Sequence, residues 1–228
     1  MYAKVVTVQL VNMLGYHLLF QDVDIVWYRD PLPALRQPPF SDFDVVFQDD
    51  GAHTLRYAPY SANSGFYYVR HNAKTRYLFA EFLYNGELIL QKKSHQQALT
   101  ALLGEHASRH GLKVKIIPME DLDFLGGFHY HRKIDTMRAL AKDEVKPSMF
   151  HMSWTSNKKN KLLFMKQMGM WYVNGSCVDK NVTDITSGSL VADCCAAKPI
   201  VTCHYRDKAS IVSCEDSPAI DKGKPSFW

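Results

Sequence analysis

Two aspartates, Asp22 and Asp24, interrupt the apolar segment YHLLFQDVDIVWYRDP with one residue between them. On a straight strand, side chains at i and i+2 point to the same face, so the two carboxylates would repel each other unless a cation or a proton relieves them. Carboxylates of this kind hold Mg²⁺ or Mn²⁺ together with substrate phosphates. The bare pattern fits a solvated loop that caps the following turn equally well.

Helices and strands that could position this pair alternate along the chain. The periodicity predicts helices over 3–14, 72–86, 94–110 and from 157 to near 169, and strands over 17–28, 43–50, 64–70, 113–118 and 149–154, with a proline-punctuated loop over 30–39. Such alternation indicates an α/β domain. In an open α/β sheet, ligands gather at the carboxyl ends of the strands, where the acidic pair would lie.

The composition narrows the class of protein. The net charge of +4 comes without dense Lys/Arg runs, which argues against a nucleic-acid partner and suits an anionic small ligand. The sequence contains neither an apolar run long enough to span a membrane nor a signal peptide at its start.

All five cysteines fall after residue 176, beside two glycosylation sequons at Asn174 and Asn181. Their spacing fits no CxxC zinc pattern, and it favours a disulfide-bonded tail in an oxidising compartment, with one thiol left over. We therefore expect a catalytic domain over 1–173, a Cys-rich irregular tail over 174–228, and a location in the Golgi or secretory-pathway lumen.

Several segments in a definite order resemble the nucleotide-diphospho-sugar transferase family that includes plant and algal cell-wall xylosyl- and arabinosyltransferases. These segments are LGYHLLFQDVDIVWYRDP, ANSGFYYVR and MFHMSWTSNKKNK. The resemblance covers roughly residues 1–173. It implies a GT-A fold, which is a Rossmann-type mixed sheet flanked by helices.

The resemblance also implies roles for single residues. Asp22, Asp24 and His151 would bind Mn²⁺ or Mg²⁺ on a nucleotide-diphospho-sugar, a UDP-sugar being expected. Candidates for catalysis are Asp50, His95 and Gln96, and candidates for substrate binding are Asp49, Asn63, Ser64, Gly65, Trp154, Lys158 and Lys161. Several have a structural alternative: a buried core histidine for His151, a solvated helix face for the lysines, a tight strand entry for Asn63 and Gly65, and turn capping for Asp49 and Asp50.

Two features depart from the family pattern. His95, in HQQALTALL, stands where the family usually has an aspartate, and Gln96 matches the glutamine that follows it. The family also places a nucleotide-binding βαβ portion before the first helix, so we expect this portion, with any membrane anchor, to precede residue 1.

The expected function is metal-dependent, retaining transfer of a pentose or hexose to a hydroxyl of a glycan or glycoprotein. Two alternatives stay open at this point. One is a non-catalytic sugar- or nucleotide-binding remnant. The other is a phosphohydrolase of the haloacid dehalogenase type, in which Asp22 would be the nucleophile and Asp24 the acid.

Overall fold

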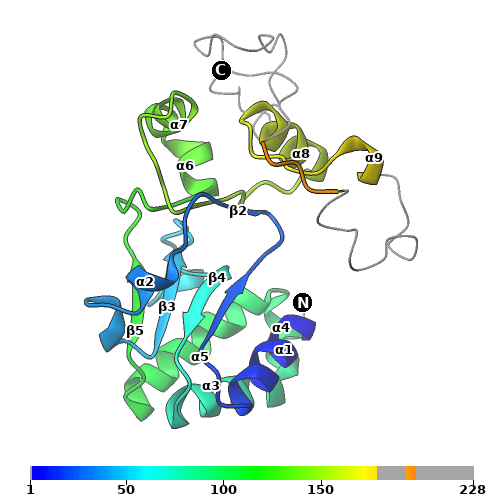
Figure 1. Ribbon diagram of the computed structural model, residues 1–228. Coiled ribbons are helices and arrows are strands. Elements are labelled where there is room, and N and C mark those ends of the chain that lie inside the picture. The colour runs from blue at the N-terminus through cyan, green and yellow to red at the C-terminus, as the bar shows by residue number, and fades with distance from the viewer. Residues whose placement is uncertain (1, 179–193, 199–228) are drawn as a thin grey trace. The chain divides into compact units, whose positions relative to one another are not determined.

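A computed structural model of the chain describes residues 2–178 and 194–198, which Figure 1 draws as coloured ribbon. The chain divides into two compact units, Met1–Phe128 with Lys146–Ser153, and His129–Val145 with Trp154–Trp228. The described elements are helices and mixed sheets, which confirms the predicted α/β class.

The first unit contains two sheets. The larger has the strand order β1 (Leu18–Gln21), β4 (Ala62–Val69), β3 (Val45–Asp49) and β5 (Val114–Ile117). Because β4 is antiparallel to both β1 and β3, and β3 is parallel to β5, the carboxyl ends of β1, β3 and β5 lie at one edge. The smaller sheet has the order β2 (Ile25–Trp27), β7 (Met149–His151) and β6 (Phe124–Gly126).

Both faces of the larger sheet are covered. Helices α1 (Tyr2–Met13), α3 (Ala73–Tyr84), α4 (Gly86–Lys92) and α5 (His95–His110) lie on one face (Figure 1). They enclose a core that includes Val8, Phe47, Tyr67, Phe79 and Leu103. A second core on the other face includes Val46, Phe66, Tyr68, Phe124 and Met149. Burial on both faces explains why β3 and β4 read as nearly continuous apolar runs.

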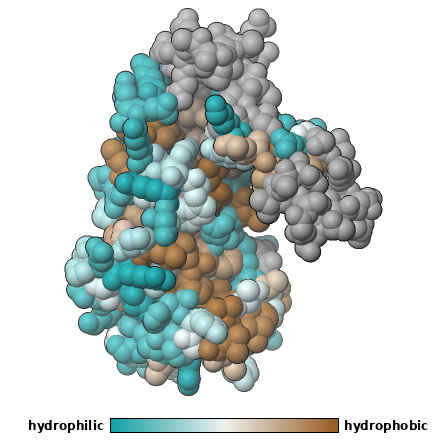
Figure 2. Space-filling model, in the orientation of Figure 1, coloured by the Kyte–Doolittle hydropathy of each residue, from teal (hydrophilic) through white to brown (hydrophobic). Residues whose placement is uncertain are grey.

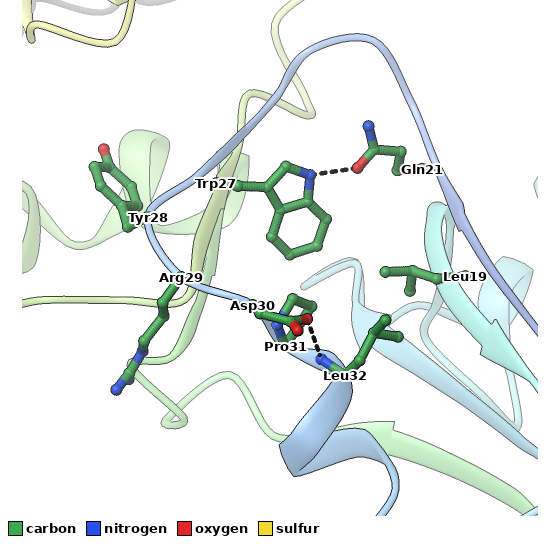
Figure 3. A pocket seen from close by; sticks show the side chains of 8 residues that line it. All are labelled: Leu19, Gln21, Trp27, Tyr28, Arg29, Asp30, Pro31 and Leu32. Atoms are coloured by element: carbon green, nitrogen blue, oxygen red, sulfur yellow. Dashed lines mark hydrogen bonds between the residues drawn. The ribbon is translucent and has the colours of Figure 1, made fainter. Parts of the chain in front are cut away.

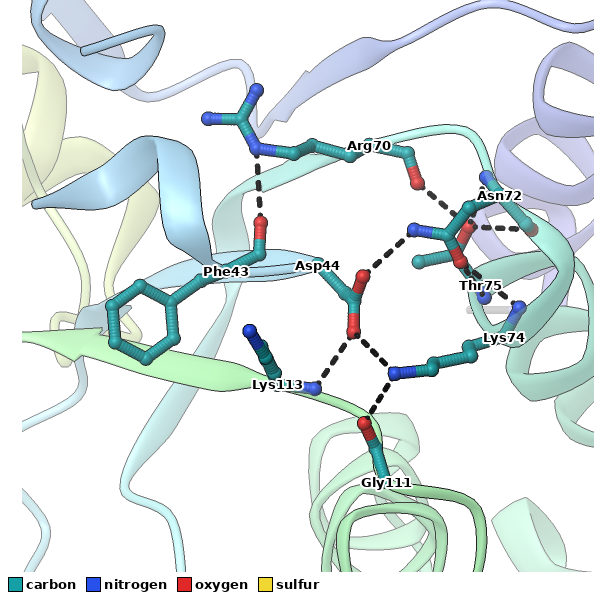
Figure 4. Close-up of polar contacts among 8 residues, drawn as sticks. All are labelled: Phe43, Asp44, Arg70, Asn72, Lys74, Thr75, Gly111 and Lys113. Atoms are coloured by element: carbon teal, nitrogen blue, oxygen red, sulfur yellow. Dashed lines mark hydrogen bonds and ion pairs between the residues drawn. The ribbon is translucent and has the colours of Figure 1, made fainter. Parts of the chain in front are cut away.

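A polar network joins the elements at the start of β3, the end of the sheet away from Asp49 (Figure 4). The Asp44 carboxylate accepts hydrogen bonds from Asn72 Nδ2 and from the backbone N–H of Lys113, both at 2.8 Å. Asn72 also caps α3, because its Oδ1 accepts the N–H groups of Lys74 and Thr75. These bonds fix β3, β5 and α3 relative to one another.

One short helix lies where the sequence predicted only a loop. Helix α2 (Leu32–Leu35) is a single turn with proline at its start. Proline fixes φ near the helical value and its missing N–H is not needed in a first turn, so Pro31 and Pro33 allow a helix that the proline content argued against.

The second unit is helical. It contains most of α6 (Gly127–Arg132), with α7 (Ile134–Ala141), α8 (Lys158–Gln167) and α9 (Gly175–Val178). The buried ring of Tyr130 packs 4.7 Å from that of Phe164. The sequence did not predict α6, α7 or α9.

A disulfide joins Cys177 and Cys194 in this unit, which confirms a disulfide in the predicted Cys-rich tail. Cys195 is exposed and forms no disulfide within the described ranges. Cys203, Cys214 and the sequon at Asn181 lie outside the described residues. The boundary between residues 173 and 174 stays a prediction.

The surface of the first unit carries apolar side chains on the face that Figure 2 shows, in the region of α1. Leu10, Met13 and Leu14 are exposed, whereas Gln9 and Asn12 of the same helix are buried. Helix α1 therefore turns part of its apolar surface outward. Over residues 2–178 and 194–198, no helix is sufficiently long and apolar to cross a membrane.

Candidate functional site

Asp22, Asp24 and His151 come together at the carboxyl ends of β1 and β7. Each offers one ligand atom, and these atoms all lie within 4.8 Å of one another. The chain leaves β1 at Gln21, turns through Val23 and enters β2, whose first residue, Ile25, is paired with His151. His151 Nε2 consequently lies 3.4 Å from Asp24 Oδ1.

The two aspartates are close for a different reason than the sequence suggested. They do not share the face of a straight strand, because the chain turns between them from the larger sheet to the smaller one. Backbone hydrogen bonds hold the two sides of this turn: Asp22 N donates to Gly65 O at 2.7 Å, and Met152 N donates to Asp24 O at 3.0 Å. The expected pairing of the carboxylates is present, and the expected strand geometry is wrong.

This donor set fits a divalent cation. An ion about 2.1 Å from each ligand atom requires ligand atoms roughly 3–4 Å apart. His151 Nε2 and Asp24 Oδ1, at 3.4 Å, meet that condition, and an oxygen of Asp22 lies within 4.8 Å of both residues' ligand atoms. Two carboxylates and a neutral imidazole suit Mn²⁺ or Mg²⁺ better than soft metals, which prefer thiolates. His151 is 2% exposed whereas both aspartates are half-buried, so an ion would reach the ligands from the aspartate side.

Gly65 of β4 packs directly against two residues of this cluster. A Cβ at this position would lie 2.6 Å from His151 Cε1, 2.8 Å from Asp22 Oδ2 and 3.0 Å from Asn63 Oδ1. Real Cβ atoms do not approach neighbours so closely, so only glycine lets β4 pass beneath the two ligands. This close approach is directed at two residues of the candidate metal cluster, and a part for Gly65 in substrate binding stays a prediction.

Lys4 of α1 adds a positive charge on one side of the cluster. Its ammonium forms an ion pair with Asp22 Oδ1, and both side chains are partly exposed. The ammonium therefore offsets one of the two carboxylate charges that the sequence identified as mutually repulsive.

His95 and Gln96 begin α5 and bind the start of β4. Ser64 Oγ lies 2.9 Å from His95 Nε2, and Gln96 Oε1 accepts from both Ser64 N and Ser64 Oγ at 3.1 Å. Burial is the main cause that lowers the pKa of His95 to about 4; the charge of Lys4 acts in the same direction and that of Asp22 in the opposite one. His95 is therefore neutral near pH 7, in a position where the family pattern led us to expect a negative charge.

A hydrogen bond between Asp50 and Asn63 joins the end of β3 to the start of β4. Asn63 Nδ2 donates to Asp50 Oδ1 at 3.0 Å, and Asn63 Oδ1 accepts from Gly65 N at 2.7 Å. Both side chains are buried. The neighbouring Asp49 instead accepts from Gly51 N at 2.7 Å and pairs with His53, so its carboxylate is used within the turn after β3.

Comparison with known proteins shows the family of the chain. The model of the family described as nucleotide-diphospho-sugar transferase matches residues 1–165. The chain belongs to the nucleotide-diphospho-sugar transferase family. This transferase chain is also 38% identical over 69 residues to the beta-arabinofuranosyltransferase RAY1 of Arabidopsis thaliana. That match covers 30% of this chain and 13% of the relative, so the chain spans a small part of the protein it resembles. No solved structure matches the chain significantly.

Three predicted residues of the transferase lie in the second unit. Trp154 has a φ of +65° and its ring lies 6.0 Å from that of His131. Lys158 begins α8 and is exposed, and Lys161 lies one turn further along and is half-buried. Asn157 caps this helix by accepting from Lys159 N and Asn160 N. Their part in substrate binding stays a prediction.

A pocket of about 440 Å³ opens beside the acidic segment of the transferase (Figure 3). Trp27 Nε1 donates to Gln21 Oε1 across it, and Asp30 Oδ1 accepts from Leu32 N at 2.9 Å. The lining is largely apolar and comprises Leu19, Gln21, Trp27, Tyr28, Arg29, Asp30, Pro31 and Leu32. The segment that carries Asp22 and Asp24 thus also forms much of a pocket.

Two residues at the site of the transferase were missed from the sequence. Lys4 looked like an ordinary exposed residue of the first helix. Gln48 lies in the apolar run FDVVFQDD, and its side chain is 3% exposed. A single amide inside a buried strand is the signal that could have identified Gln48, because a buried amide needs partners.

Proposed function

We propose that this chain carries the metal-binding part of a glycosyltransferase that moves a sugar from a nucleotide-diphospho-sugar to a hydroxyl of a glycan or glycoprotein. The cluster of Asp22, Asp24 and His151 carries this proposal, because its oxygen and imidazole donors lie within the region that matches the family. Similarity to a beta-arabinofuranosyltransferase supports a pentose as the transferred sugar.

Asp22, Asp24 and His151 would hold Mn²⁺ or Mg²⁺. A divalent ion bound there supplies positive charge that stabilises the diphosphate as it leaves the sugar. Lys4 would contribute to the same task, because its ammonium already lies against Asp22 and can donate to phosphate oxygens. We also assign the leaving diphosphate to Lys158 and Lys161, as the resemblance implies.

The sugar would lie against the start of β4 and of α5. The resemblance implies contact of the sugar or acceptor with Asn63 and the Gly65 backbone, and Asp50 would act through Asn63, to which it is hydrogen-bonded. His95 would act as a neutral hydrogen-bonding group rather than as a counter-charge for the reacting carbon. In the proposed reaction, the acceptor oxygen forms a bond to the anomeric carbon, the bond from that carbon to the diphosphate breaks, and the hydroxyl proton leaves with the diphosphate. Retention of configuration is the expected outcome.

A UDP-sugar is the proposed donor, and the Golgi or secretory-pathway lumen is the proposed location. The disulfide between Cys177 and Cys194 supports an oxidising compartment. The family match is incompatible with the haloacid dehalogenase alternative. The neutral His95 favours one second candidate, a remnant that binds a nucleotide or a sugar without transferring it.

Incubation of the chain with UDP-sugars and an acceptor, with and without Mn²⁺, tests the proposal. We expect release of UDP that requires the metal and is lost in the Asp24→Asn variant. Binding of UDP and Mn²⁺ without turnover of any donor would support the remnant instead. Turnover that continues in the presence of EDTA would contradict the metal assignment.

A further inference from the structure

Gln48 is the polar member of an otherwise apolar strand, and its place in β3 directs it toward the smaller sheet. Side chains alternate along a strand: Val45 and Phe47 pack in the core beneath the helices, and Val46 packs in the core on the opposite face. Gln48 is two residues after Val46, so its side chain points to the same face of the sheet. It meets β6 and His151 on that face.

The hydrogen bonds of Gln48 determine which way its amide faces. Nε2 lies 3.0 Å from Phe124 O and 3.0 Å from Leu125 O. Backbone carbonyls can only accept, so both need an N–H donor, and a reversed amide would place its oxygen against two oxygens. Oε1 must therefore point the other way, where it lies 2.9 Å from His151 Nδ1.

This orientation fixes the proton on His151. An acceptor facing Nδ1 requires Nδ1–H, so in the neutral imidazole the other nitrogen, Nε2, carries the lone pair. Nε2 is the nitrogen that lies 3.4 Å from Asp24 Oδ1, inside the ligand cluster. The amide thus leaves the lone pair on the side where a cation would bind.

Gly126 leaves the space that this arrangement needs. It is the β6 residue paired with His151 in β7. A Cβ on Gly126 would lie 2.8 Å from Gln48 Nε2, which is too close for unchanged packing. The amide is therefore enclosed between β6, β7 and the imidazole, and it has little freedom to rotate.

We propose that Gln48 is a positioning residue that holds the His151 ring in the Nδ1-protonated tautomer, with Nε2 oriented to bind the metal. Metal-ligating histidines generally donate their second N–H to a neighbouring acceptor, which fixes both the tautomer and the ring. The consequence for metal binding rests on the proposed function. The tautomer of His151 does not rest on it, because the hydrogen bonds exist without an ion.

The first test is the tautomer in the metal-free chain. Long-range ¹H–¹⁵N NMR of the imidazoles distinguishes Nδ1–H from Nε2–H, and comparison with the His151→Gln variant assigns the signal. We expect Nδ1–H in the wild-type chain. A His151 ring that is protonated on Nε2 and not on Nδ1 would overturn the inference, whatever the activity of the protein.

Two variants of Gln48 test the consequence. Gln48→Leu removes all three hydrogen bonds at similar volume. Gln48→Glu keeps an acceptor for Nδ1–H, and its second oxygen must be protonated to donate to one of the two β6 carbonyls. We expect Gln48→Leu to lose the single Nδ1–H tautomer and to weaken Mn²⁺ binding, measured by electron paramagnetic resonance, about 10- to 100-fold. Gln48→Glu should retain the tautomer and bind Mn²⁺ more tightly than Gln48→Leu.

The possible failures are distinguishable. Thermal unfolding of each variant shows whether it is folded, and the wild-type tautomer decides the inference even if Gln48→Leu does not fold. Equal Mn²⁺ affinity in folded Gln48→Leu and wild type would overturn the positioning role. Absence of Mn²⁺ binding to the wild-type chain would instead contradict the proposed function, and the tautomer measurement would still decide the role of Gln48.

Discussion

Replacing Gly65 by alanine tests the proposed metal site, because it adds a methyl group against two of the proposed ligands. A methyl carbon there would lie 2.6 Å from His151 Cε1 and 2.8 Å from Asp22 Oδ2. Non-bonded atoms prefer separations of about 3.5–4.0 Å. Each of the two side chains would therefore have to move away from the added methyl carbon by roughly 1 Å. Metal sites keep their ligand distances within about 0.2 Å, and we therefore expect the Kd for Mn²⁺ to rise about 10- to 100-fold.

Titration of the chain with Mn²⁺, followed by the electron paramagnetic resonance signal of the free ion, measures this change. Overpacking also lowers the free energy of unfolding by about 1–3 kcal/mol, so urea denaturation of both proteins is needed to show that the variant is folded. A folded Gly65→Ala variant that binds Mn²⁺ as tightly as the wild type would refute the assignment of Asp22 and His151 as ligands.

Gly104→Ala is the matched control. This glycine lies in α5, and its Cβ would lie 3.0 Å from Pro59 Cδ, a tight contact that involves no proposed ligand. We expect its Kd for Mn²⁺ to equal that of the wild type. If both variants weakened Mn²⁺ binding equally, the effect of Gly65→Ala would be a general loss of packing.

Three further predictions concern charge, pH and the disulfide. Lys4→Met removes a cation that competes with Mn²⁺ for Asp22. Calorimetry should therefore show about two- to fivefold tighter Mn²⁺ binding without nucleotide and about tenfold weaker UDP binding with Mn²⁺ present. A change of the same sign in both affinities would argue against this role of Lys4. The pKa of His95 is lowered from 6.5 to about 4, so its neutral form stabilises the fold above pH 6.5 and this contribution is lost as the pH falls toward 4. The His95→Gln variant lacks this contribution, and urea denaturation across that range should show a smaller decrease in its free energy of unfolding than in that of the wild type; equal decreases would contradict the shift. Cys177→Ser opens a disulfide to Cys194 that spans 17 residues, and thermal unfolding should show a loss of about 3 kcal/mol that reductant reproduces in the wild type; an unchanged midpoint would show that the bond does not stabilise the fold.

Elements with strong local signals could be predicted from the sequence. Helices α3 and α5 combine apolar periodicity with capping side chains at Asn72 and Ser94, and β3 and β4 are buried apolar runs. Helix α6 was not predicted, because its segment opens with two glycines and is rich in histidine. Helix α7 was overlooked although Ile134, Met137 and Leu140 stand at helical spacing. Packing of Tyr130 on Phe164, which no local pattern reveals, contributes to that part of the structure.

In the candidate site, too, some features could be predicted from the sequence, and others depend on contacts between distant segments. Asp22 and Asp24 were identified from their spacing, and His151 from the family resemblance. The turn at Val23 could not be foreseen, because it depends on the pairing of Ile25 with His151 in another sheet.

The supporting residues depend on distant partners as well. Lys4 pairs with a residue 18 positions away, and Gln48 with one 103 positions away. Such contacts are set by the fold, so the sequence can mark Gln48 as a buried amide that needs partners but cannot show that His151 is one of them.

Coupling between Mn²⁺ and UDP measures the central claim most directly. Calorimetry of UDP binding to this chain, with and without saturating Mn²⁺, should show binding that the metal strengthens by tenfold or more, and Asp24→Asn should abolish that difference. UDP affinity that is the same with and without Mn²⁺, or coupling that survives in folded Asp24→Asn, would contradict the proposal that these carboxylates bind a metal on a nucleotide diphosphate.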